Sequence, residues 1–194
     1  KPEYAAELEP LQEVYGSGVT LKVLPAPMGA ESTPLPEDFE EAPEVFGCEG
    51  KGCVEVVVRV TNDRAGHYMP SGDPERHIEV VAEATTDDGE VVARSYDLIG
   101  SRYKWWPEIE LIKDTRIPPM EHRDLLVRIP REAAARGVTL DVHADKWRMY
   151  TGAFEHHDLD GEYVRGRRFH TSTWGVGEDG EVTIESFDSA IEVR

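Results

Sequence analysis

The chain has 194 residues and a mass of 21.8 kDa, and its hydrophobic residues, 39% of the total, suffice for one domain with an ordinary core. The formal net charge of −18 would repel nucleic acid and anionic lipid headgroups, which excludes nucleic-acid partners. No apolar run approaches the ~20 residues of a membrane-spanning helix, so no membrane span is expected.

The N-terminal part, residues 1–47, is expected to form a helix or strand and an extended Pro-rich arm ahead of the main domain. Pro2 to Tyr15 predicts a short amphipathic helix. Five prolines and many acidic residues between 25 and 43 predict an extended Pro-rich arm. Such an arm cannot bury enough apolar surface to order itself. We therefore expect Leu35 and Phe39 to anchor it in a groove of this chain or of a neighbouring copy.

Two cysteines, Cys48 and Cys53, open the expected main domain at residues 48–194. The haem-attachment pattern C-x-x-C-H is absent, so no covalent haem is expected. The glycines between the cysteines let the chain turn back, which favours a disulfide, and the alternative is a reduced pair. A disulfide suits an exported protein. Since the sequence begins with Lys1 rather than Met, we expect an extracellular mature form after signal-peptide removal.

Alternation of apolar and polar residues dominates the rest of the chain. Its period of two is that of half-buried strands. It runs through residues 54–61, 78–84, 125–129 and 138–144, and strand-like segments follow at 182–187 and 191–194. Asp-Gly pairs suited to hairpin turns lie at 88–89, 160–161 and 179–180. Residues 131–136 predict one helical turn. We therefore predict an all-β fold, an antiparallel Ig-like β-sandwich of seven to nine strands with minor helix.

The loop after residue 61 contains Asn62, the only asparagine of the chain. Its amide would either hold a turn or bind an ion. Calcium takes oxygens from carboxylates, amides and carbonyls, and the candidate ligands are Asn62, Asp63, Asp73, Glu75 and Asp114. The alternative is that Asn62 and Asp114 cap turns through hydrogen bonds to the backbone.

His67 and Met69 lie in the same loop at a spacing of two residues. On an extended segment their side chains would point to the same side. There they would bind copper, or the iron of a haem carried by another chain. The alternative is that both pack under the loop.

The pair Trp105 and Trp106 is expected in a loop, where it would suit a subunit contact because Trp is enriched at interface hot spots. No nucleophile elbow, phosphate-binding loop, dinucleotide fingerprint or zinc-hydrolase motif is present. We therefore expect no enzymatic activity.

The run from Val60 to Asp73 has the form N-x-x-x-G-H-x-x-P-S-G from Asn62 onward. It resembles a haem-free β-sandwich domain associated with multihaem c-type cytochromes, in which Thr usually stands at the place of Ser71. The resemblance covers roughly residues 54–147, and it implies an exported β-sandwich. The chain is also similar to secreted filament-forming proteins of thermophiles. Scarce Asn and Gln among many charged residues are typical of proteins from hot environments.

These observations predict a secreted structural protein, a homo-oligomeric subunit of an extracellular filament or layer. Calcium would offset the repulsion between acidic copies. The alternative is a periplasmic or cell-surface redox accessory domain, in which His67 lends a ligand to a partner's haem or to copper. An absorbance spectrum and negative-stain microscopy would separate the two.

Overall fold

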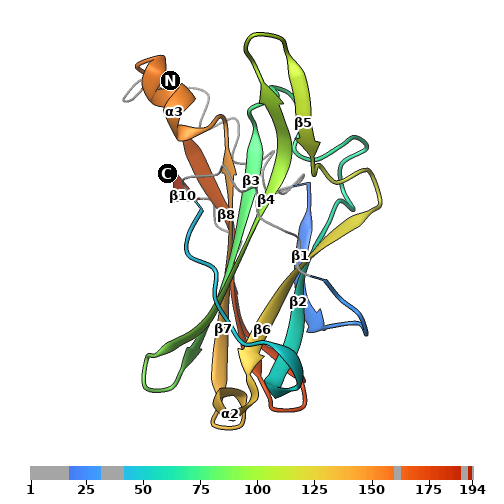
Figure 1. Ribbon diagram of the computed structural model, residues 1–194, viewed down its shortest axis with the longest axis vertical. Helices are drawn as coiled ribbons and strands as arrows, with labels where there is room; N and C mark the ends of the chain where they lie inside the picture. Colours follow the sequence, from blue (N-terminus) through green and yellow to red (C-terminus); the bar gives the residue numbers. More distant parts are fainter. Residues whose placement is uncertain (1–17, 32–41, 160–162, 189–191, 194) are drawn as a thin grey trace.

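The computed structural model describes residues 18–31, 42–159, 163–188 and 192–193 (Figure 1). The helix expected at 2–15, the anchors Leu35 and Phe39, and the turn expected at 160–161 lie outside these residues.

Ten strands in the described residues form two antiparallel sheets. The smaller sheet has the order β1, β2, β6, and these strands span Thr20–Pro25, Cys53–Thr61 and His122–Pro130. The larger sheet has the order β10, β8, β7, β3, β4, β5, and β9 also pairs with β8. Its strands are β3 (His77–Thr86), β4 (Val91–Lys104), β5 (Glu110–Asp114), β7 (Val138–Trp147), β8 (Gly166–Val176), β9 (Val182–Asp188) and β10 (Glu192–Val193). The predicted all-β sandwich is confirmed, but the described residues contain ten strands where seven to nine were expected.

Helix is minor, as predicted. The described residues contain the 3-10 turn η1 (Gly50–Gly52) and the helices α2 (Arg131–Ala134) and α3 (Thr151–His156). α2 is the predicted single turn, and it is followed by Gly137, whose φ of 96° favours glycine. No helix in the described ranges is long and apolar enough to cross a lipid bilayer.

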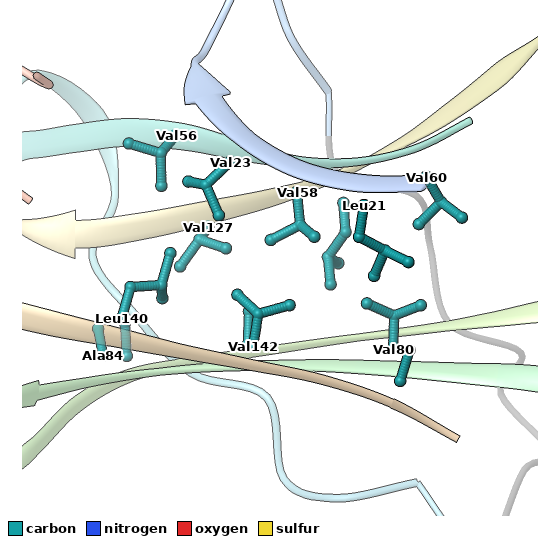
Figure 2. Packing of buried hydrophobic residues seen from close by; sticks show 14 of the residues in the cluster. Leu21, Val23, Val56, Val58, Val60, Val80, Ala84, Val127, Leu140 and Val142 are labelled. Atoms are coloured by element: carbon teal, nitrogen blue, oxygen red, sulfur yellow. The ribbon is translucent and has the colours of Figure 1, made fainter. Parts of the chain in front are cut away.

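The core lies between the two sheets (Figure 2). Alternate valines of β2, from Val54 to Val60, pack in one cluster with Ile78 and Val80 of β3, and all of them are buried. Full burial of one such side chain contributes about 1.5–3 kcal/mol. The apolar positions of the alternating pattern are therefore the residues whose side chains point into the core.

β1 precedes the expected domain boundary at residue 48 and yet belongs to the sandwich. It pairs with β2 along its length, from Thr20 opposite Thr61 to Pro25 opposite Val56. Leu21 and Val23 are buried in the common core. The smaller sheet thus contains a strand from the N-terminal part of the chain.

Candidate functional site

Asn62 holds the loop that follows β2. Its side chain is fully buried, and its Nδ2 donates to the carbonyl oxygens of His67 at 2.8 Å and Ile117 at 2.9 Å. Its Oδ1 accepts from the backbone N–H of Ala65 at 3.3 Å. The side-chain amide of Asn62 therefore fixes the turn at residues 62–67 and links it to the loop before β6. This is the role that the first of the two interpretations of Asn62, holding a turn, had expected.

Asp63 and Asp73 are engaged in separate local contacts. Asp63 accepts a hydrogen bond from Thr20 Oγ1, which joins the loop to the start of β1. Asp73 Oδ1 accepts from the backbone N–H of Glu75 at 3.0 Å, as in an Asx turn. The pKa of Glu75 is raised, chiefly by partial burial of its carboxyl group and secondly by the nearby negative charge of Asp73.

Asp114, at the end of β5, pairs with Arg116 at 2.6 Å and also caps the backbone N–H of that residue. These hydrogen bonds lower the pKa of the Asp114 carboxyl group. In the described part of the chain, no three His, Cys, Asp or Glu side chains are grouped so as to hold a metal ion. The five oxygen donors considered for calcium are therefore not brought together into one ligand set.

His67 and Met69 do not present their side chains together. Met69 is buried in the core beneath the loop. His67 is exposed, and its Nδ1 lies 3.0 Å from the carbonyl oxygen of Tyr68. Met69 thus packs as the alternative interpretation expects, and His67 alone faces the solvent.

Cys48 and Cys53 form a disulfide, with a Cα–Cα distance of 5.8 Å. The predicted bond is confirmed. It closes the turn that leads into β2, and Arg131 donates to the carbonyl oxygen of Cys53 at 3.1 Å. The hydrogen bond from Arg131, and not the disulfide itself, joins the start of β2 to α2.

The hairpin of β4 and β5 carries a run of exposed apolar side chains. Trp106 is 81% exposed and Ile109 is 69% exposed, and Trp105, Leu111 and Ile112 are each about half exposed. We call these five residues the hairpin surface. The hairpin lies at one end of the molecule along its longest axis (Figure 1). Exposed apolar residues that gather on one hairpin in this way mark interaction sites.

β5 strengthens this interpretation because it is an edge strand. Among the described strands it pairs only with β4. Leu111 and Ile112 are neighbours in the strand, so their side chains point to opposite faces of the sheet. Both are exposed, and an exposed apolar edge strand favours pairing with another chain. The sequence had indicated the tryptophans but not these aliphatic residues, whose spacing breaks the period of two.

An open hollow of about 410 Å³ lies between the start of β7, the end of β8 and β9. Four carboxylates line it, those of Asp87, Asp179, Glu181 and Glu185, and no basic residue does. We call this the acidic hollow. It lies at the end of the molecule that contains the turns after β3 and β8, opposite the hairpin surface (Figure 1).

A buried histidine lies on β8 near its pairing with β9. Trp174 Nε1 donates to Ser172 Oγ at 2.8 Å, and His170 Nε2 lies 2.9 Å from the same oxygen. The ring of Phe187 packs edge-on against His170. Burial lowers the pKa of His170 to about 4, so the ring is neutral at pH 7.

His170 should make the stability of the protein depend on pH. Its pKa is about 4 in the folded protein and 6.5 for an unperturbed histidine, so the unfolded chain binds the proton first. Stability should fall as pH drops from 6.5 towards 4, by up to about 3 kcal/mol from this residue. Urea unfolding across this range should show a shallower loss for a His170→Gln variant. The carboxylates titrate alike in both proteins, and equal slopes would contradict the prediction.

The chain matches no family model and no curated protein. Among solved structures it is similar to a penta-haem cytochrome c552 from Thermochromatium tepidum, with a TM-score of 0.46 and 15% sequence identity over 77% of this chain. The chain spans 38% of the length of that cytochrome chain. A similarity at this level carries no conclusion about function.

Proposed function

We propose that this protein is a structural subunit that assembles with copies of itself into an extracellular filament or layer. The observation that carries the proposal is the hairpin surface, an exposed apolar run over the loop between β4 and β5 and the edge strand β5, at one end of the molecule. The disulfide supports an exported protein, because such bonds persist in oxidising compartments.

Charge favours the same surface. Copies that each carry −18 repel one another over most of their area. The segment 102–116, which contains the hairpin surface, holds four basic and three acidic residues, so it carries less negative charge than the chain as a whole. Apolar burial, chiefly of Trp105 and Trp106, would then supply the binding energy.

Removing the most exposed anchor should weaken assembly. A Trp106→Ser variant should associate about 30-fold more weakly than wild type, the effect of losing about 2 kcal/mol at a hot spot. Sedimentation velocity over a concentration series measures this. Met120→Ser removes a methionine that is 77% exposed outside the hairpin surface and should leave assembly unchanged. Wild-type protein that stays monomeric at high concentration would refute the proposal.

In this proposal calcium acts by reducing the repulsion between acidic copies. The described residues give it no grouped carboxylate site, so its effect would be spread over the acidic surface. Sedimentation with calcium and with a chelator tests this role.

The second candidate function, a redox accessory domain, rests on His67 alone, since Met69 is buried. An exposed imidazole can lend a ligand to a haem or copper held by a partner. A change in the absorbance spectrum of a haem protein on mixing, lost with His67→Gln, would favour it.

A further inference from the structure

Three basic side chains at one end of the larger sheet lack a counter-ion. In a chain with 39 acidic and 21 basic residues, a basic side chain is expected to find a carboxylate. Six arginines do so, namely Arg59, Arg94, Arg116, Arg123, Arg128 and Arg168. Within the described residues, Arg76, Lys146 and Arg167 form no ion pair with any carboxylate.

Lys146 and Arg167 continue the core-facing positions of two neighbouring strands. On β7, Ala144 is fully buried in the core, and Lys146 is the next residue whose side chain points to that side. On β8, Arg167 lies two residues before Phe169, which also belongs to the core. Lys146 and Arg167 are opposite each other in the pairing of the two strands, and opposite residues project from the same face of a sheet. Both side chains are partly buried at the end of the core.

Arg76 adds a third positive charge from the next strand. Lys146 is opposite Ile78 of β3, and Arg76 lies two residues before Ile78, just ahead of that strand. Burial, and secondly the charge of Arg76, lower the pKa of Lys146. Arg76 itself is exposed and donates to the carbonyl oxygen of Ser71 at 3.4 Å. The group of three charges is therefore open to solvent on the side of Arg76.

We infer that Arg76, Lys146 and Arg167 form a binding site for a small oxyanion, such as phosphate or sulfate. A partly buried charge without a counter-ion is costly, and the anion would supply the missing charge. Guanidinium groups offer paired N–H donors that match two oxygens of such an anion, and an ammonium group adds further donors. The site lies at the end of the molecule that carries α3 (Figure 1). It is separate from the hairpin surface and does not depend on assembly.

Isothermal titration calorimetry with inorganic phosphate at neutral pH tests the site. Wild type should bind one phosphate per chain. Lys146→Met and Arg167→Gln should each bind at least about tenfold more weakly, the effect of losing a hydrogen bond to a charged group. Lys22→Met removes an exposed lysine of β1 and should bind like wild type. Absence of binding by wild type, or equal binding by all four proteins, would refute the site.

Urea unfolding at constant ionic strength gives a second readout. In chloride, Lys146→Met should be at least as stable as wild type, because it removes a partly buried charge that has no counter-ion. Phosphate at about ten times its Kd should raise the folding equilibrium constant of wild type about 11-fold and that of Lys146→Met about twofold or less. Exclusion of phosphate from the protein surface stabilises both proteins alike. An equal response of the two would show this general effect alone and would overturn the site.

Discussion

An Asn62→Asp variant should unfold with a free energy at least about 3 kcal/mol below that of wild type. The change replaces the Nδ2 donor with an oxygen that faces the carbonyl oxygens of His67 and Ile117. Two buried acceptors then lose their donor, and each such loss costs about 1–3 kcal/mol. Urea unfolding at neutral pH measures the difference.

The same variant separates the two interpretations of this loop. A calcium ligand would gain from the change, because a carboxylate binds calcium more strongly than an amide does. Asp63→Asn, which alters the exposed neighbour, should change stability by no more than about 0.5 kcal/mol. An Asn62→Asp protein that is stabilised when calcium is added would overturn the turn-holding role.

A strand could be predicted from the sequence when only one of its two faces is buried. β2 and β3 have one face in the core, and their alternating residues revealed them in the sequence. β4 is different, because every residue from Ser95 to Ser101 is buried. A strand covered on both faces loses its period of two, so only the hairpin turn expected at residues 88–89 indicated a strand here. β8 was missed as well, since its inward positions include His170 and Ser172 instead of aliphatic residues.

The candidate surfaces depend on pairings that a sequence does not show. The scarcity of asparagine singled out Asn62, but its partner Ile117 lies 55 residues away along the chain. The hollow likewise joins the turn at Asp87 to the hairpin at Asp179. Only the order of strands in the larger sheet, with β3, β7 and β8 as neighbours, places these acidic turns at one end.

An Arg123→Leu variant should lose about 3–5 kcal/mol of unfolding free energy. Arg123 of β6 reaches Asp97 of β4 through two hydrogen bonds, of 2.5 Å and 3.0 Å, and so links the two sheets. The Asp97 side chain is only 6% exposed. Removing the guanidinium group leaves this carboxylate buried without its counter-ion, which costs more than the pair itself contributes.

Two further variants test that explanation by urea unfolding. Arg59→Leu breaks a pair with Asp124 that has the same two-bond geometry but is more exposed on both sides, so it should cost no more than about 1 kcal/mol. In the double variant Arg123→Leu/Asp97→Leu, no charge remains buried. Its stability should return to within about 1–2 kcal/mol of wild type, because apolar side chains of similar size replace a buried ion pair well. A double variant as unstable as Arg123→Leu alone would show that the link between the sheets, rather than the stranded carboxylate, accounts for the loss.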